Sequence, residues 1–324
     1  KLGVLRFMSD WKLSIGTAGA VGARQLKIDA LPTTAYVMLG EHCLRNCAFC
    51  AQARSSTSQS KFLSRVAWEE TPEAEAIRNI GLAFQAGKIK RACLQVVNTP
   101  DSHALVIRAL DEFKKYGELP VVVSSHFTTV EQAAELFAKG AARLGLALDV
   151  ATPELFANIK GGSWQNRWDL LCACAERFPG QMTTHLIVGL GETEKEMWQV
   201  ICECYKRQIT VGLFAFTPLK GTKFADRQPP DRGSYRRLQI GLELLKKGFA
   251  ATVVECENER ITKINVPSLR EVLADGHAFR TTGCEDCNRP YYNEKPRDVL
   301  YNYHRPLTVE ELELAFVESG VAGC

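Results

Sequence analysis

The sequence predicts an α/β fold of the TIM type: a full or nearly closed (β/α) barrel with a cysteine-containing C-terminal extension. Two observations predict it. Short apolar segments rich in β-branched residues alternate with longer amphipathic segments between residues 34 and 265, and such alternation is typical of parallel strands joined by crossover helices. About seven such units occur, as in a TIM-type barrel. The chain has 324 residues, a length that such a barrel reaches as one domain.

Each predicted element begins and ends at residues that favour a boundary. TAYVMLG (34–40) is the first predicted strand, and the helix predicted over 69–87 opens at Thr71-Pro72 and closes at Gly87, because proline suits the first helical turn and glycine the C-cap. Gly140 closes the helix predicted over 129–140 in the same way. The other predicted strands are 91–97, 119–125, 142–148, 182–190, 211–216 and 249–256, and the other predicted helices are 102–117, 163–178, 192–208 and 232–248.

The pattern divides the chain into three regions. Residues 1–33 are predicted to be a helical lead-in, 34–265 the barrel and 266–324 the extension. After about residue 265 the sequence becomes rich in turn residues, aromatic residues and proline, until a short closing helix predicted within TVEELELAFVESG.

Composition narrows the class of protein. Apolar residues make up 46% and charged residues 24% of the chain, which is ordinary for a soluble globular enzyme. The net charge of +3 is too small to indicate nucleic-acid binding, although it permits an acidic protein partner. The sequence shows no signal peptide and no apolar run of the roughly 20 residues that span a bilayer. We therefore expect a cytoplasmic protein, in which clustered cysteines indicate metal or redox sites rather than disulfides.

The densest cysteine cluster lies in EHCLRNCAFCAQAR (41–54), which contains Cys43, Cys47 and Cys50. It follows the first predicted strand, on the side of a TIM barrel that carries active sites. Iron–sulfur clusters usually take four cysteine ligands, so three thiolates would leave one iron open to a small molecule. The alternative is a noncatalytic zinc-binding module in which the pairs Cys47/Cys50 and Cys284/Cys287 form a four-cysteine site. That alternative leaves Cys43 without a role.

The C-x3-C-x2-C spacing, with Phe49 before the last cysteine, resembles the radical S-adenosylmethionine (SAM) superfamily. The resemblance implies a [4Fe–4S] cluster on Cys43, Cys47 and Cys50, with the amino and carboxylate groups of SAM on the open iron. It also implies an electron donor that reduces the cluster. SAM is then cleaved to a 5′-deoxyadenosyl radical, which removes hydrogen from an unactivated C–H bond. The cofactor supplies this chemistry, and the barrel positions it.

A second segment places the resemblance in the biotin-synthase-like branch. LALDVATPELFANIKGGSWQNRWDLL (146–171) resembles the part of biotin synthase that contains an aspartate for the SAM ribose and an arginine for the SAM carboxylate. The resemblance implies these roles for Asp149 and Arg167. The residues alone leave open a helix N-cap for Asp149 and a solvated helix face for Arg167.

Two further segments extend the resemblance over residues 34 to about 250. LIVGLGET (186–193) resembles the glycine-rich strand end beside SAM, which implies that Gly189, Gly191 and Glu192 contact SAM. Glycine lets a backbone approach a ligand closely. TPLKGTKFAD (217–226) also resembles biotin synthase.

The chain departs from biotin synthase at its second cluster. Biotin synthase holds a [2Fe–2S] cluster with three cysteines and an arginine, but only Cys93 stands at one of those cysteine positions here, and Thr183 occupies another. We therefore predict that Cys93 is a small buried strand residue, the commoner environment of a free cysteine. The pairs Cys172/Cys174 and Cys202/Cys204 are likewise predicted to pack within helices.

A different group of thiols is predicted to hold an auxiliary iron–sulfur cluster. Cys284-x2-Cys287 lies in a tight polar turn, a spacing typical of metal ligands. Cys256 is expected to end the last barrel strand and to bring that turn over the barrel mouth, and Cys324 is the fourth candidate ligand. Zinc on the same four cysteines is the alternative.

The run GCEDCNRPYYNEKP (283–296) resembles the two-protein type of lipoyl synthase. The resemblance implies a radical SAM sulfurtransferase that works with a companion radical SAM subunit to insert sulfur into an octanoyl-lysyl carrier protein. The alternatives are an atypical biotin synthase acting on desthiobiotin and a cluster-maturation radical SAM enzyme.

Overall fold

A curled nine-stranded sheet forms the centre of the protein, in a computed structural model that describes residues 11–59, 61–295 and 297–321. The strand order is β3-β4-β1-β2-β5-β6-β7-β8-β9. From β2 onward each neighbouring pair is parallel, so the predicted α/β barrel class is confirmed. The parallel strands are β2 (Thr34–Leu39), β5 (Arg91–Val96), β6 (Val121–Ser124), β7 (Ala141–Gly145), β8 (Met182–Val188) and β9 (Thr210–Ala215).

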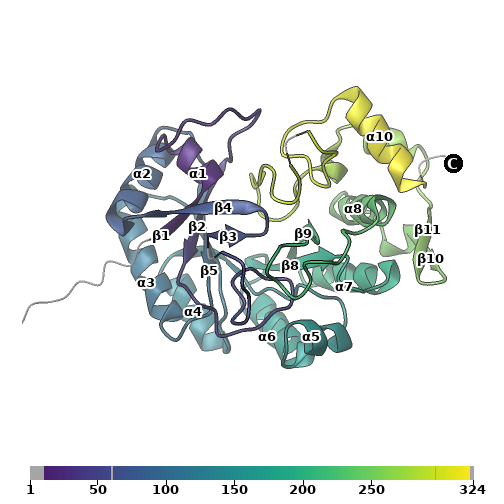
Figure 1. The fold of residues 1–324 in the computed structure, drawn as a ribbon. Helices are drawn as coiled ribbons and strands as arrows, with labels where there is room; N and C mark the ends of the chain where they lie inside the picture. The colour runs from purple at the N-terminus through teal and green to yellow at the C-terminus, as the bar shows by residue number, and fades with distance from the viewer. Residues whose placement is uncertain (1–10, 60, 296, 322–324) are drawn as a thin grey trace, which may run out of the picture.

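Amphipathic helices connect the parallel strands and cover the outside of the curl (Figure 1). Their N-caps follow local sequence rules: Thr129, Thr152, Ser163 and Thr193 each accept a hydrogen bond from the first helical turn. The helices are α2 (Glu73–Gln85), α3 (Ser102–Phe113) with η1 (Lys114–Tyr116), α4 (Val130–Ala138), α5 (Pro153–Ile159), α6 (Trp164–Arg177), α7 (Glu194–Lys206) and α8 (Arg232–Lys246).

The barrel is open rather than closed. In the part of the chain that the structure describes, β3 and β9 are the two edges of the sheet and do not pair with each other. The strand predicted over 249–256 is not a barrel strand: β10 (Val254–Glu257) follows η2 (Ala251–Val253) and pairs only with β11 (Arg260–Ile264). The physical reason is the turn at Asn258-Glu259, whose two positive φ angles of 47° and 64° favour a tight antiparallel hairpin.

Three antiparallel strands extend the sheet beyond β2, and the first of them, β1, lies within 1–33, where a helical lead-in was predicted. β1 (Trp11–Ser14) pairs with both β2 and β4 (Val66–Thr71), and β4 also pairs with β3 (Phe62–Leu63). All four β1 residues are buried, so burial on both faces outweighs local propensity. Between residues 11 and 33, which the structure describes, the helical residues are the six of α1 (Ile15–Ala20). The helix predicted over 69–87 starts at Glu73 because β4 occupies the residues before it.

The C-terminal segment after residue 280 occupies the open side of the barrel. It covers the free edge of β9, where Thr282 Oγ1 accepts a hydrogen bond from Leu213 N at 2.7 Å and Asn293 Nδ2 donates to Ala215 O at 2.7 Å. An uncovered edge would expose unpaired backbone groups. The same segment also contacts the residue before β2, where Thr33 N donates a hydrogen bond to Asn288 Oδ1 at 3.0 Å.

Buried contacts anchor the end of the chain to α8. Arg236 is fully buried and donates hydrogen bonds to Leu300 O at 2.5 Å and Tyr301 O at 2.7 Å. Arg236 also forms an ion pair with Glu318, with 2.9 Å between Arg236 Nε and Glu318 Oε2. Figure 1 shows the last helix over α8. The remaining elements are α9 (Leu269–Val272), η3 (His277–Phe279) and α10 (Val309–Ser319). Within the described ranges, no helix is both long and apolar enough to cross a membrane.

Candidate functional site

The three-cysteine loop leaves the carboxyl end of β2, as predicted, and lines a cavity of about 190 Å³ with all three thiols. Backbone hydrogen bonds anchor the loop to its neighbours: Leu44 N donates to Asn98 O and Ala48 N to Ile159 O, each at 2.8 Å. Burial raises the pKa of Cys47 and, with the neighbouring Cys47 thiol, raises that of Cys50 to about 12.

A small apolar cluster supports this loop from behind. Ala48, between the cysteines, packs with Phe156, Leu190 and Phe216. Leu190 belongs to the glycine-rich turn after β8. The Glu192 carboxylate closes this turn by accepting hydrogen bonds from Gly189 N at 2.6 Å and Leu190 N at 3.0 Å. The structure thus gives this turn a supporting position behind the loop.

The turn residues Gly189, Gly191 and Glu192 are absent from the lining of the three interior cavities described below. An added Cβ at Gly191 would lie 3.2 Å from the Leu155 side chain, so glycine is explained here by packing. The predicted contact of these three residues with SAM stays a prediction.

Asp149 lies in the same cavity as the three cysteines, as the resemblance implied. Its backbone has a φ of +66° and bridges to β8, with Asp149 N donating to His185 O at 2.8 Å. Its carboxylate accepts a hydrogen bond from Lys160 Nζ at 2.5 Å. The N-cap of the following helix is Thr152, which leaves the Asp149 side chain to face the cavity.

Sequence reasoning missed Lys160, which holds the Asp149 carboxylate and also donates to Ala147 O at 2.9 Å. The lysine stands 11 residues after Asp149, beyond the end of α5, and its buried side chain returns to the loop that follows β7. A lysine at the end of a short helix gives no sequence signal for such a contact.

Arg167 lines the same cavity instead of a solvated helix face. Burial and the neighbouring Arg45 guanidinium lower its pKa to about 10. Within residues 11–59, 61–295 and 297–321, its guanidinium donates no hydrogen bond. His126, also missed by sequence reasoning, lines the cavity with a buried Nε2 atom that has no partner in the described residues. Burial, Arg167 and Arg45 lower its pKa to about 4, so its imidazole is neutral near pH 7.

The donor set fits an iron–sulfur cluster with SAM. Cys43, Cys47 and Cys50 supply three soft thiol ligands, and the unpartnered Arg167 guanidinium suits a carboxylate. In the described ranges, no three His, Cys, Asp or Glu side chains converge on a point that would hold a single ion. A cluster of several irons distributes its thiolates over different metal atoms, so thiols around a shared cavity are the relevant arrangement.

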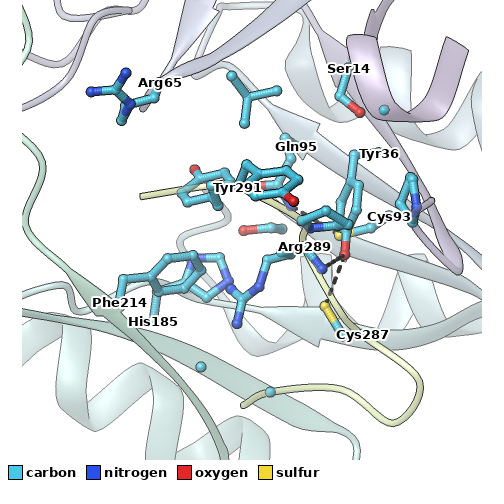
Figure 2. A pocket seen from close by; sticks show the side chains of 18 of the residues that line it. Ser14, Tyr36, Arg65, Cys93, Gln95, His185, Phe214, Cys287, Arg289 and Tyr291 are labelled. Carbon is cyan, nitrogen blue, oxygen red and sulfur yellow. Dashed lines mark hydrogen bonds between the residues drawn. The ribbon is translucent and has the colours of Figure 1, made fainter. Parts of the chain in front are cut away.

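A larger cavity of about 420 Å³ fills the barrel interior. It is lined by Cys284 and Cys287 and, unexpectedly, by Cys93. Figure 2 shows Tyr36, Cys93 and Cys287 together on one side of this cavity, with the Tyr36 hydroxyl 3.2 Å from Cys287 Sγ. Cys93 was predicted only as a packing residue.

A third cavity, of about 150 Å³, lies between the other two. Cys50 and Asp149 line it together with His185, Phe214 and Tyr292, and these last three also line the large cavity. Gln95 lines all three cavities. The cysteine loop and the buried thiols therefore face connected parts of one interior.

The structure corrects the predicted placement of the auxiliary thiols. The expectation that the turn at Cys284 and Cys287 lies over the barrel mouth is wrong. Lys90, just before β5, pairs at 2.7 Å with Asp286 of that turn, so the turn lies at the amino ends of the strands. Cys256 is on the β10–β11 hairpin, outside the lining of the three cavities, where burial and then Glu194 raise the pKa of its thiol. Cys324 lies outside the described residues.

The other predicted packing cysteines lie in or beside the core. Cys174, Cys202 and Cys204 are buried within the main hydrophobic core, and Cys172 is half-buried on α6.

Comparisons with known proteins agree with this geometry. Residues 37–202 match the radical SAM superfamily. The ribosomal protein uS12 methylthiotransferase RimO of Syntrophobacter fumaroxidans is 28% identical over 250 residues, which are 72% of this chain and 54% of RimO. The biotin synthase of Mycobacterium tuberculosis is 26% identical over 189 residues, 57% of this chain and 52% of that enzyme. The chain thus spans about half the length of these relatives.

Solved structures share the fold at low identity. The FeFe-hydrogenase maturase HydG of Carboxydothermus hydrogenoformans aligns with a TM-score of 0.53 and 13% identity, over 67% of this chain and 52% of HydG. Methylornithine synthase PylB aligns with a TM-score of 0.52 and 15% identity, over 63% of this chain and 61% of PylB. Identities this low support the fold alone.

Proposed function

The chain belongs to the radical SAM superfamily, and we propose that it inserts sulfur at an unactivated carbon as one member of a two-protein lipoyl synthase. The proposed substrate is an octanoyl-lysyl carrier protein, and the proposed partners are a companion radical SAM subunit and an electron donor. When bound, a [4Fe–4S] cluster with SAM supplies a hydrogen-abstracting radical, and an auxiliary iron–sulfur cluster supplies sulfide.

The residues of the 190 Å³ cavity have distinct roles in this proposal. Cys43, Cys47 and Cys50 hold the first cluster, with Phe49 packed beside them. Arg167 binds the SAM carboxylate. Lys160 fixes the Asp149 carboxylate at 2.5 Å, so that its free lone pairs can accept hydrogen bonds from the ribose hydroxyls. Gly189, Gly191 and Glu192 complete the SAM site by holding the loop in place.

One observation carries the sulfur-insertion proposal: a second group of thiols faces the same barrel interior as the three-cysteine loop. Cys284 and Cys287 line the 420 Å³ cavity, which shares His185, Phe214 and Tyr292 with the 150 Å³ cavity beside Cys50. A substrate carbon in this interior can therefore approach both sites. The names of the matched relatives, a methylthiotransferase and biotin synthases, are consistent with sulfur as the transferred atom.

An atypical biotin synthase is the second candidate. The matched biotin synthases and the size of the large cavity, about 420 Å³, favour it, because a cavity of this size admits a small free substrate.

A paired substrate assay distinguishes the two. The anaerobically reconstituted chain is incubated with SAM, a reductant and either an octanoylated carrier protein or desthiobiotin, with and without the companion subunit. Mass spectrometry should show carrier that has gained sulfur and desthiobiotin that has not. Formation of biotin would contradict the lipoyl synthase proposal and support the atypical biotin synthase. SAM cleavage without sulfur in either product would contradict sulfur insertion altogether.

A further inference from the structure

Cys93 faces the barrel interior because of its position in β5. Side chains alternate between the two faces of a strand, and Ala92 and Leu94 are fully buried in the core under the helices. Cys93 and Gln95 therefore share the opposite, cavity-facing side, and both line the 420 Å³ cavity. In the sheet register, Cys93 is opposite Tyr36 of β2.

The turn that carries Cys284 and Cys287 approaches the same level of the barrel. Gly283 has a φ of +115°, a conformation that favours glycine, and a Cβ added there would lie 3.6 Å from the Gly212 backbone on β9. Thr282 Oγ1 fixes the approach by accepting a hydrogen bond from Leu213 N. The Tyr36 hydroxyl, 3.2 Å from Cys287 Sγ, connects the turn to β2, directly beside Cys93.

The surroundings of these thiols favour an anionic metal centre. All three cysteines line the 420 Å³ cavity, and the Tyr36 hydroxyl, on the residue that pairs with Cys93 in the sheet, lies 3.2 Å from Cys287 Sγ. Three guanidinium groups accompany the thiols: Arg91 lies on β5, the strand of Cys93, Arg143 lies on β7, and Arg289 follows Cys287 by two residues in the same turn. Guanidinium groups beside thiols stabilise the thiolate form that binds metal.

Arg289 is held at this position by the barrel itself. Its guanidinium lies 3.9 Å from the centre of the Phe214 ring and donates a hydrogen bond to Thr282 O, and its backbone N–H donates to the Tyr36 hydroxyl at 3.2 Å. The arginine is thus positioned between the thiols and the aromatic wall shared with the smaller cavity (Figure 2).

We infer that Cys93, Cys284 and Cys287 together ligate the auxiliary iron–sulfur cluster, at the amino end of the barrel, and that Cys256 is not a ligand. Arg289 and Tyr36 act as positioning residues that compensate the charge of the thiolates and hold the turn. This inference rests on the proposed function only in taking the auxiliary metal to be an iron–sulfur cluster.

Metal content and spectra of anaerobically reconstituted variants test the inference without a sulfur-transfer assay. Cys93→Ala should lose about half of the bound iron and the spectroscopic signal of one of two clusters, while it still cleaves SAM. Cys93→Ser, which nearly keeps the side-chain volume, should show the same iron loss without a packing defect. Matched controls are Cys174→Ala, a fully buried cysteine on α6, and Cys256→Ala. Both should keep the parental iron content.

The outcomes separate this inference from the proposed function. If Cys284→Ala/Cys287→Ala loses iron but both Cys93 variants keep the parental iron content and spectrum, Cys93 is not a ligand and only this inference fails. An iron loss in Cys256→Ala equal to that in Cys93→Ala would also overturn it. If Cys284→Ala/Cys287→Ala keeps all its iron, or loses zinc instead, the auxiliary cluster of the proposed function fails as well.

Discussion

Replacing Arg167 by alanine should weaken SAM binding by about 10- to 150-fold without changing the iron content. The guanidinium lines the cavity of the three cysteines and donates no hydrogen bond to any residue in the described ranges. A hydrogen bond between charged groups contributes about 1.5–3 kcal/mol, and 1.4 kcal/mol corresponds to a tenfold change in affinity. The affinity range follows from these two magnitudes.

The same geometry predicts that Arg167→Ala does not destabilise the SAM-free protein. Burial and Arg45 lower the pKa of Arg167 to about 10, so the protein tolerates this charge rather than being stabilised by it. The melting temperature without SAM should stay the same or rise. Arg177→Ala, in the last turn of the same helix, is the matched control and should leave both SAM affinity and iron content unchanged.

The assay is anaerobic equilibrium dialysis of SAM against the reconstituted protein, with iron quantified on the same samples. Unchanged SAM affinity in Arg167→Ala would show that the guanidinium does not bind the ligand. A fall in melting temperature together with loss of iron would show instead that Arg167 supports the loop structurally.

Three other substitutions test separate parts of the structure. Cys47→Ser should abolish production of 5′-deoxyadenosine, measured by chromatography, because a three-ligand cluster that loses a thiolate cannot keep its open iron in place; retained production would contradict the assigned ligands. Glu294→Gln should remove a pH dependence of stability. Burial raises the pKa of Glu294 from 4.5 to about 7, so between these values the native state binds a proton that the unfolded state releases. The free energy of unfolding of the parent should therefore fall as pH rises from 4.5 through 7. Parallel curves of unfolding free energy against pH for parent and variant, measured in urea, would contradict this role of Glu294. Arg236→Met should lower the free energy of unfolding by about 3–5 kcal/mol, because it removes the buried partner of Glu318, which keeps only the more exposed Arg232, and leaves the Leu300 and Tyr301 carbonyls unpaired; urea unfolding that matches the parent would show that the C-terminal segment is anchored elsewhere.

Local sequence patterns were sufficient to predict the repeating part of the fold. The strands at 91–97, 182–190 and 211–216 and the helices between them lie within a few residues of β5, β8 and β9 and their helices, since hydrophobic periodicity and caps are local signals. The three-cysteine loop was predictable for the same reason: it follows the first parallel strand, whose carboxyl end is fixed by the fold class.

Long-range contacts determined what the sequence could not predict. Trp11–Ser14 becomes a strand only because β2 and β4 flank it. Lys160 reaches Asp149 across a loop and a helix, and His126 enters the cavity from the loop after β6. No local pattern identifies these partners. The turn-rich sequence around Cys284 indicated a metal site but not the end of the barrel at which it lies, because its path depends on contacts with Thr33, Lys90 and Leu213.

The positions of the two thiol groups limit the shape of a substrate that uses both. The three-cysteine loop lies at the carboxyl ends of the strands, and Cys284 and Cys287 lie toward the amino ends. His185, Phe214 and Tyr292 line the interior between them. Reacting atoms must approach within roughly 3–3.5 Å, so the attacked carbon has to reach the radical source and the sulfide source in turn or from one position between them. An unbranched acyl chain can extend past these aromatic side chains and slide along the interior. Desthiobiotin carries a ring beside its attacked carbons, which restricts such sliding and favours the acyl carrier in the proposed function.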